Sequence, residues 1–411
     1  MIPRFKPSLG ISEILAALHP PREDDVGRFE QSFAKLMGQK HALAFPYGRT
    51  ALMLLLEALE LKNKEIICPA YTCVVVPHAI VYSGNTPVFV DCESNGFNMD
   101  LDLAEKAITE KTGAIIATSL FGYPVNLDRL DEIRNHHPDI YVIEDCAHSF
   151  AAEWRGRQAQ KEGIAAFFGL NISKTLTSVF GGMVSTDNEL IHKRLKTMRD
   201  QKIGQPDWWK GFRRLLYLVA VCVGFWQPLY SLINRLERSG VLNYFSQYYD
   251  ETKIDMPSDY LSGISNLEAR VGLENLKRYD QIIESRRAAA HHYFSSLKDK
   301  NSNVGNGLLQ ENTYILPPKI DGATYSHFVI QVSDRPNLLK SYIRRGIQLG
   351  WLIEYNIPEM KSYGAHPPEE FPIAARYARS AINLPVWGGA KLAEKVSNAI
   401  SKGIVSGKPH A

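Results

Sequence analysis

Short apolar runs alternate with helical patterns from about residue 24 onward. Most runs are near-continuously apolar and rich in Ile, Val, Phe or Ala, which is typical of strands buried on both faces. These runs predict strands at His41–Phe45, Glu65–Cys68, Pro87–Val90, Gly113–Thr118, Ile140–Ile143, Ala165–Phe168 and Gly182–Ser185. Helical patterns lie between several of them, at Ala51–Leu61, Asp100–Glu110 and Asn126–Asn135. Strands alternating with helices predict an α/β fold with a mostly parallel central sheet.

The later part of the chain predicts a second, smaller domain. Apolar positions recur at helical spacing over Ser265–Leu297, which predicts one long linking helix. A strand-like stretch, Thr324–Val332, and a helix-like stretch, Pro336–Arg345, follow it. We therefore expect a large domain over residues 1–264, and a linker helix with a small α+β domain over residues 265–411.

A hydrophobic insert at about residues 204–256 departs from this alternation. Leu215–Ile233 carries no charged residue; as one helix it would extend roughly 28 Å, near the ~30 Å of a hydrocarbon core. Pro228 interrupts the stretch, however, and basic residues flank both of its ends. Two interpretations stay open. The insert is a hairpin buried in the fold or in a dimer interface, or residues 208–238 dock peripherally or re-entrantly on a membrane. In the second case Trp208, Trp209, Phe225 and Trp226 are the aromatic anchors.

Composition narrows the class of protein. Of 411 residues, 45% are hydrophobic and 22% charged, as in globular proteins, and the net charge of +3 gives no reason to expect nucleic acid as a partner. The five cysteines form no CxxC pair, which favours a reducing compartment over a disulfide framework or a metal site. The first 24 residues suggest a short amphipathic helix and not a signal peptide. We expect a cytoplasmic protein. If the insert docks on a membrane, we expect the protein to associate with the inner face of that membrane.

A first candidate for chemistry is Asp145, which ends a predicted strand in IYVIEDCAHSF (residues 140–150). Ligands of open α/β sheets sit at the carboxyl ends of strands. A carboxylate buried there needs a cation, and a protonated pyridine nitrogen is such a cation. The simpler alternative is a helix N-cap.

A second candidate is Lys174, in a polar loop between two predicted strands and ahead of Gly181-Gly182. A lysine whose amine is partly neutral can form a Schiff base with an aldehyde cofactor. Taken alone, a loop lysine is usually a solvated surface charge.

A third candidate is the turn Gly48-Arg49-Thr50, between a predicted strand and a helix. Helix N-terminal amides and the Thr50 hydroxyl can hold a phosphate, although many such turns bind nothing. Together the three motifs supply a phosphate site, a partner for a pyridinium and a Schiff-base lysine. That is the set of groups a pyridoxal 5'-phosphate (PLP) enzyme needs.

A colinear series of motifs makes the chain resemble the DegT/StrS family of sugar aminotransferases, which have the fold-type I PLP architecture. The resemblance covers about residues 24–200 and 258–400. It rests on VGRFEQSFAKLMGQKHALAFPYGRTAL, ICPAYTCVVVPHAI, GNTPVFVDC, FGYPVNLDRL, IEDCAHSF, SKTLTSVFGG, SNLEARVGLENL, YSHFVI and NLPV.

The resemblance implies a role for several residues. Lys174 matches the lysine that holds PLP and shuttles the proton, Asp145 the carboxylate on the pyridine nitrogen, and His148 the neighbour of the cofactor ring. The family's phosphate-binding turn corresponds to Gly48, Arg49 and Thr50 of this chain. His327 matches a histidine beside the active-site entrance, where it would contact substrate; a structural hydrogen bond explains a strand histidine equally well.

The chain also departs from the family pattern. Cys73 stands where an aromatic residue usually stacks on the cofactor ring, so either Tyr71 takes over that contact or the ring packs on aliphatic groups. Gly169 replaces a phosphate-contacting serine, and Phe180 replaces a glutamate before Gly-Gly. Residues 261–263 replace Asn-x-Arg, whose asparagine normally reaches the neighbouring subunit's cofactor.

The resemblance implies that an amino acid, glutamate by family precedent, gives its amino group through PLP to a keto group. The implied acceptor is a nucleotide-linked sugar in surface polysaccharide or glycolipid synthesis, and the implied assembly is a homodimer. Three alternatives remain: a membrane-associated or lipid-like carbonyl acceptor, a related sugar dehydratase, and an inactive binding protein. Family dehydratases carry histidine in place of the lysine, so Lys174 argues against the second.

Overall fold

The computed structural model describes residues 1–150, 152–239, 250–297 and 314–405. A seven-stranded sheet forms the centre of the large domain, in the order β1-β9-β8-β5-β4-β2-β3. The strands are β1 (His41–Phe45), β2 (Glu65–Pro69), β3 (Thr86–Val90), β4 (Thr112–Thr118), β5 (Tyr141–Asp145), β8 (Ala165–Gly169) and β9 (Gly182–Thr186). Neighbouring strands are parallel, except that β9 runs antiparallel to both β1 and β8. The seven predicted strands and the mostly parallel sheet are confirmed.

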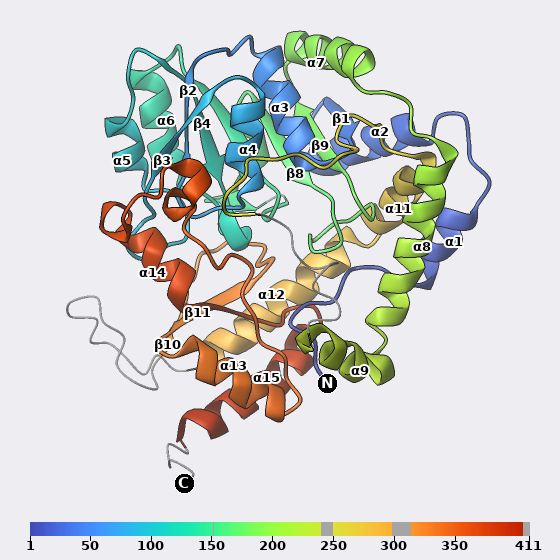
Figure 1. The fold of residues 1–411 in the computed structure, drawn as a ribbon, viewed down its shortest axis with the longest axis vertical. Coiled ribbons are helices and arrows are strands. Elements are labelled where there is room, and N and C mark those ends of the chain that lie inside the picture. The colour runs from blue at the N-terminus through green and yellow to red at the C-terminus, as the bar shows by residue number, and fades with distance from the viewer. Residues whose placement is uncertain (151, 240–249, 298–313, 406–411) are drawn as a thin grey trace.

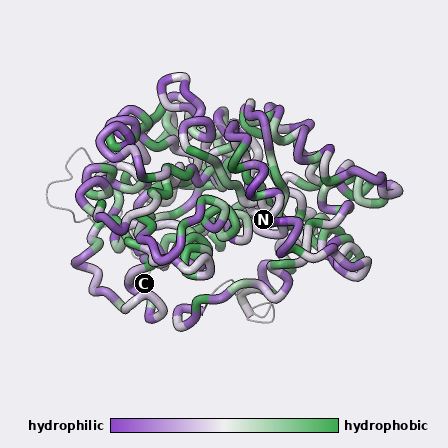
Figure 2. Tube along the Cα trace, turned by 90° about the horizontal axis from the view of Figure 1, so that it is seen from above, coloured by the Kyte–Doolittle hydropathy of each residue, from purple (hydrophilic) through white to green (hydrophobic). Residues whose placement is uncertain are grey.

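Helices cover both faces of this sheet (Figure 1). One hydrophobic cluster packs α3 (Gly48–Ala58), α4 (Val75–Tyr82) and α7 (Glu189–Lys202) against the strands. Two further clusters occupy the other face, where the covering helices are α2 (Asp25–Met37), α5 (Leu101–Lys106), α6 (Leu127–His136) and α11 (Asn266–Leu276). Figure 2 shows the resulting distribution, with hydrophobic residues concentrated along the inner strands and hydrophilic residues on many outer turns.

The C-terminal part of the chain, predicted as a smaller domain, is built around a three-stranded sheet in the order β10-β11-β12, and the hydrophobic cluster around this sheet also includes Tyr71, Phe97 and Phe121 from the first part. Its elements are α12 (Tyr279–Ser296), β10 (Tyr314–Ile315), β11 (Phe328–Val332), α13 (Arg335–Arg344), α14 (Pro372–Ser380), β12 (Ala381–Leu384) and α15 (Gly389–Val405). Short elements elsewhere are β6 (Glu153–Trp154), β7 (Arg157–Gln158), η1 (Leu120–Gly122), η2 (Ala159–Lys161), η3 (Ile357–Glu359), η4 (Lys361–Tyr363) and η5 (Pro368–Glu370).

Two expectations for this part of the chain were wrong in detail. The single helix predicted over Ser265–Leu297 is two helices, α11 and α12, separated at Lys277 and Arg278, where Arg278 has φ −103° and ψ 9°. The strand predicted from Thr324 begins at Phe328, because Tyr325 adopts a left-handed φ of 47° that ends extended pairing.

The described part of the insert forms two helices, α8 (Trp208–Gly224) and α9 (Gln227–Arg238), on the right of Figure 1. Among the described residues no single helix is long and apolar enough to cross a bilayer. Only the pair Trp208–Gly224 and Gln227–Leu236, bent by 104°, reaches the required length and apolarity. Residues 240–249 of the insert lie outside the described part of the chain.

Helix α8 differs from an ordinary surface helix because it exposes an apolar stripe and covers two cations, beside the buried Leu218. Its outward stripe is apolar, with Trp208 78% exposed and Trp226, just past its end, 61% exposed; Phe212, Leu216, Val219 and Val223 lie between them. Its inward side carries two cations, of which Lys210 is only 2% exposed and Arg214 is largely covered. A solvent-facing helix normally buries its apolar stripe and exposes its charges. The outer stripe of α8 therefore resembles a contact surface.

Helix α1 (Ile11–Leu18) shows a similar arrangement beside α8. Its outward residues Ile11, Leu15 and Leu18 are exposed and recur at helical spacing. Its charged residue Glu13 is fully buried and pairs with Arg278. Helices α1 and α8 contact each other and both pack on α11. Two neighbouring helices thus direct apolar side chains outward, which enlarges the contact surface.

A buried carboxyl group in the sheet yields a stability prediction. Glu144 of β5 is fully buried, and neither of its carboxylate oxygens has a hydrogen-bond partner among the described residues. Burial, and secondarily Glu162, raises the pKa of Glu144 well above its ordinary value. The group is therefore protonated in the fold and ionised in the unfolded chain at neutral pH. Its contribution to stability is fully present below the ordinary glutamate pKa and is lost as pH rises toward the folded pKa.

Glu144→Gln should consequently raise the melting temperature at pH 8 and change it little near pH 5. The expected gain is about 1.4 kcal/mol for each unit by which the folded pKa is raised. Thermal unfolding of both proteins at the two pH values measures it. If the variant and the wild type melt at the same temperature at pH 8, burial of the Glu144 carboxyl does not destabilise the fold at that pH.

Candidate active site

Three segments meet at one edge of the central sheet. Strands β5 and β8 are parallel, with Asp145 opposite Phe167, so their carboxyl ends lie together. Strand β1 is antiparallel to β9, which is antiparallel to β8, so β1 ends at the same edge. The turn into α3 follows β1, Asp145 ends β5, and the loop carrying Lys174 follows β8. Their convergence at strand ends matches the usual position of ligand sites in such sheets.

Asp145 is buried and fixed by two hydrogen bonds. The Ala147 amide donates to Oδ1 at 3.0 Å, and the Thr118 hydroxyl donates to Oδ2 at 3.3 Å. Burial raises the pKa of Asp145, while the Ala147 amide, Lys174 and Thr118 act in the opposite direction. A cationic ligand group at this carboxylate would offset the cost of burying its charge.

Lys174 is half-buried, and burial lowers the pKa of its ammonium against the opposing effects of Cys73 and Asp145. A lowered pKa increases the neutral fraction that a nucleophilic amine requires. Gly169 makes room for this side chain, since a Cβ at that position would lie 3.2 Å from Lys174 Cε. The serine usual at position 169 would therefore crowd the lysine in this chain.

Two neutral histidines border the same space. The His148 and His327 ring centroids are 5.6 Å apart, and Phe121 stacks on His148 with its amide directed at Nδ1, 3.4 Å away. Burial, followed by nearby cations that include Lys174, lowers the pKa of each histidine well below its ordinary value. Both rings are therefore neutral at physiological pH. His327 also contacts the Ser326 hydroxyl through Nδ1 at 3.1 Å, which is a structural contact, and its contact with substrate stays a prediction.

The turn at the start of α3 lies against the lysine loop. A Cβ at Gly48 would meet the Phe168 carbonyl at 3.1 Å, and one at Gly182 would meet the Gly48 nitrogen at 2.5 Å. The first amides of α3, from Gly48 to Thr50, have no acceptor within the helix and can bind an anion. The Thr50 hydroxyl, however, donates to the Tyr260 carbonyl at 3.0 Å. The amides are thus the better candidates for holding a phosphate. Arg49 is half-buried, and burial of His78, followed by the charge of Arg49, lowers the pKa of that histidine.

The groups that meet at this edge of the sheet are of the chemical kinds that bind PLP. A carboxylate, an amine with a lowered pKa and a glycine-lined helix N-terminus match the pyridine nitrogen, the aldehyde and the phosphate respectively. Cys73 is half-buried and close enough to Lys174 to affect its pKa. Tyr71 is fully buried elsewhere, with its ring against Phe121 and Tyr377 and its hydroxyl bonded to the Ile353 carbonyl. This placement gives no support to Tyr71 as a stacking partner for the cofactor.

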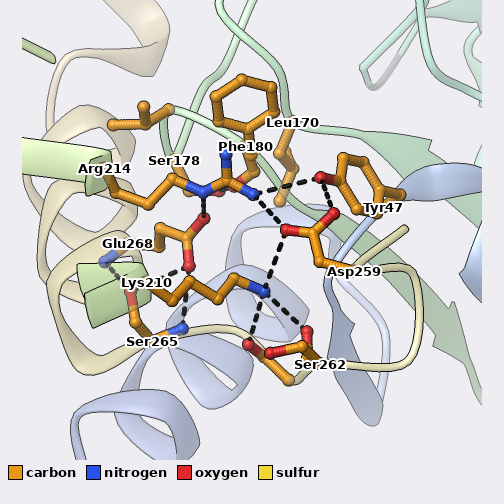
Figure 3. Close-up of polar contacts among 12 residues, drawn as sticks. Tyr47, Leu170, Ser178, Phe180, Lys210, Arg214, Asp259, Ser262, Ser265 and Glu268 are labelled. Carbon is orange, nitrogen blue, oxygen red and sulfur yellow. Dashed lines mark hydrogen bonds and ion pairs between the residues drawn. The ribbon is translucent and has the colours of Figure 1, made fainter. Parts of the chain in front are cut away.

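An ion-pair network beside the α3 turn was missed by the sequence analysis (Figure 3). Arg214 of α8 donates to Glu268 (3.0 Å), Asp259 (2.9 Å) and the Tyr47 hydroxyl (3.1 Å). Lys210 donates to the backbone carbonyls of residues 262 and 263 at 2.6 and 2.9 Å. In the sequence both cations read only as basic residues flanking a hydrophobic stretch, and no spacing links them to partners so far along the chain.

Comparisons with known proteins agree with this geometry. A GDP-perosamine synthase from Vibrio cholerae is 25% identical over 408 residues, covering 95% of each chain. An uncharacterized protein from Methanocaldococcus jannaschii is 34% identical over 214 residues, which span 50% of this chain and about half, 55%, of that relative.

Solved structures show that the fold is shared. DesV from S. venezuelae superimposes with a TM-score of 0.71 at 23% identity, covering 96% of this chain and 93% of that chain. A GDP-4-keto-6-deoxymannose-3-dehydratase gives a TM-score of 0.73 at 19% identity, covering 97% and 100%. At these identities the likeness establishes the fold-type I architecture alone. The model of the DegT/DnrJ/EryC1/StrS aminotransferase family matches residues 20–225 and 227–401. With nearly its whole length matched, the chain belongs to this family of PLP-dependent aminotransferases.

Proposed function

We propose that the protein is a PLP-dependent aminotransferase that moves an amino group from an amino acid, glutamate by family precedent, to the keto group of a nucleotide-linked sugar. The product would serve surface polysaccharide or glycolipid synthesis. The observation that carries the proposal is the convergence of Asp145, Lys174 and the α3 turn at one edge of the sheet. The GDP-perosamine synthases among the relatives support a sugar acceptor.

Each residue has a distinct task in this reaction. When bound, PLP supplies an aldehyde for the amino group and an electron-withdrawing ring. Asp145 keeps the ring nitrogen protonated, and the α3 amides hold the phosphate. Lys174 would move the proton from the α-carbon of the donor to the cofactor in the first half-reaction, and from the cofactor to the acceptor carbon in the second, acting as base and acid in each. His148, neutral beside Phe121, orients the ring, and His327 lies on the substrate side.

The identity of the residue at position 174 separates this reaction from the main alternative. Because the shared fold also serves a dehydratase, fold likeness does not decide between the two reactions. Family dehydratases carry histidine where this chain has Lys174. An inactive binding protein would have no need to keep both Lys174 and Asp145 with shifted pKa values.

The test is an absorbance spectrum of the purified protein with PLP, before and after glutamate. We expect visible cofactor absorbance that bleaches with glutamate and returns when a nucleotide-linked 4-keto sugar is added. Recovery only with hydrophobic carbonyl compounds would move the acceptor to the lipid-like class. A protein that takes up no PLP would refute the proposal.

We propose further that the working form is a homodimer on the cytoplasmic side of the membrane. The support is family resemblance for the dimer and the free cysteines for a reducing compartment. Light scattering after size-exclusion chromatography measures the mass; a monomer that is fully active would contradict the dimer.

We propose that the outer stripe of α8, with its extension on α9, contacts an anionic bilayer peripherally. No Asp or Glu occurs between Asp207 and Glu237, whereas Arg213 and Arg235 are exposed beside the stripe. Aromatic residues anchor at the membrane interface, and arginines are attracted to acidic headgroups. The stripe runs along the length of α8, so the helix would lie in the plane of the interface.

Exchanging the two stripe tryptophans for serine, Trp208→Ser with Trp226→Ser, should lower binding to phosphatidylserine vesicles at least about tenfold, because the buried apolar area is lost. Co-flotation measures it, with Leu190→Ser on α7, an exposed leucine outside the stripe, as the matched control. Wild-type protein that stays off the vesicles would refute membrane contact. If the double variant instead turns a dimer into a monomer, the stripe is a subunit interface.

A further inference from the structure

Residues on the inward side of α8 contact residues that border the candidate cofactor site. Tyr47 precedes Gly48, the first residue of α3, and its hydroxyl donates to Asp259 at 2.6 Å. Burial raises the pKa of Tyr47 to about 12, which keeps this hydroxyl protonated as a donor. Arg214 then bonds both members of the pair. The side chain that precedes the phosphate-binding amides is therefore held by a residue of the insert.

Arg214 also contacts the other side of the site. Its guanidinium lies 3.9 Å from the ring centroid of Phe180, which ends the loop that carries Lys174. Two residues later, Gly182 packs directly on the Tyr47–Gly48 peptide, with a Cβ there falling 2.4 Å from the Tyr47 carbonyl carbon. One arginine thus touches both segments that face the phosphate end of the cofactor: the α3 turn and the lysine loop.

The segment over the turn is clamped by the same helix. Thr50 bonds the Tyr260 carbonyl, and Lys210 bonds the carbonyls of Ser262 and Gly263. Family members usually carry Asn-x-Arg over these residues and a glutamate at position 180, whereas this chain has Leu-Ser-Gly and Phe180. Positions 180 and 261–263 therefore lack their usual polar side chains, and a cation from the insert occupies the space beside them.

The charges of the network balance. Arg214 and Lys210 face Asp259 and Glu268, and all four are largely covered from solvent. Removing Arg214 would leave two carboxylates opposite one ammonium, next to the turn where a phosphate dianion binds. Uncompensated negative charge in a covered site is costly and would repel that dianion.

We infer that Arg214 is a positioning residue for the cofactor phosphate, so that the hydrophobic insert is a structural part of the PLP site as well as a surface element. Arg214 acts through Tyr47, Asp259 and Phe180 and does not touch the reacting atoms. The inference rests on PLP as the cofactor and predicts a defect specific to the phosphate group.

The experiment compares PLP with pyridoxal, which lacks the phosphate. Apoprotein is titrated with each compound and followed by visible absorbance. In Arg214→Gln we expect PLP affinity to fall at least about tenfold while pyridoxal affinity changes less than about threefold. Arg214→Lys, which keeps the charge but loses the bidentate geometry, should fall between the two. Lys193→Gln, which changes an exposed lysine of α7 outside the network, should match wild type.

Each result is decisive. Unchanged PLP affinity in Arg214→Gln, or an equal loss for PLP and pyridoxal, overturns the inference, because a general structural role would weaken both ligands alike. If Arg214→Gln does not fold, the same comparison is made with Arg214→Lys, where an equal loss for both ligands is again negative. Wild-type protein that binds no PLP refutes the proposed function itself, whereas wild type and Arg214→Gln binding PLP equally refutes this inference alone.

Discussion

Lys174→Ala is expected to lower the turnover of glutamate by about 10⁴-fold or more, because one side chain supplies both the covalent attachment and the proton transfer. Lys174→Arg should be as inactive, since a guanidinium keeps the positive charge but remains protonated. The measurement is stopped-flow bleaching of the cofactor absorbance by glutamate, together with formation of 2-oxoglutarate.

Lys161→Ala changes an exposed lysine outside the site and serves as the control. It should keep the wild-type rate. A Lys174→Ala protein that retained more than about 1% of that rate would assign the proton transfer to another group.

The second large effect is expected from Asp145→Asn. The asparagine oxygen can replace Oδ1 and accept from the Ala147 amide, while its amide nitrogen can replace Oδ2 and donate to the Thr118 hydroxyl oxygen, so local geometry is retained while the negative charge is lost. Breaking a buried ion pair costs about 3–5 kcal/mol, which corresponds to a loss of roughly 10²- to 10⁴-fold in rate. Single-turnover kinetics of the glutamate half-reaction measure it.

Glu144→Gln is the matched control for this variant. The two carboxyl groups are adjacent on β5, and alternation along a strand sends them to opposite faces of the sheet. The control should keep the half-reaction rate within about threefold. Equal losses in both variants would mean that the strand, and not the charge of Asp145, limits the reaction.

The sheet could be predicted from the sequence because its strands are buried on both faces. Such strands are continuous apolar runs, and β4, buried at every residue, is the clearest example. Helix ends were less accurate: α3 begins at Gly48 and not at Ala51, since glycine and arginine do not mark the start of an apolar pattern. The break between α11 and α12 was invisible because helical periodicity continues across Lys277 and Arg278.

The candidate site likewise has a part that could be predicted from the sequence and a part that could not. Asp145, Lys174 and the α3 turn follow strand ends, so pattern and topology together bring them to one edge. The contacts of Arg214 could not be predicted, because periodicity shows which residues share a helix face but not which face turns inward. In α8 the inner side carries Lys210 and Arg214 as well as the buried Leu218, whereas much of the outer side is apolar. Contacts between residues far apart in the sequence, such as Arg214 with Tyr47, depend on tertiary packing, and no local sequence pattern indicates them.

The exposed apolar stripe and the covered cations of α8 have an evolutionary consequence. Substitutions on its outer stripe are constrained only in being apolar, so Leu216, Val219 and Val223 should exchange freely among hydrophobic residues in descendants of this chain. Substitutions at Arg214 are constrained by Phe180, whose ring lies against the guanidinium, and substitutions at Lys210 by Gly263, whose carbonyl accepts from the ammonium. A lineage that loses the helix should therefore regain polar side chains at positions 180 and 263 together. Within α8, the outer stripe and the inward cations should accept substitutions at two independent rates.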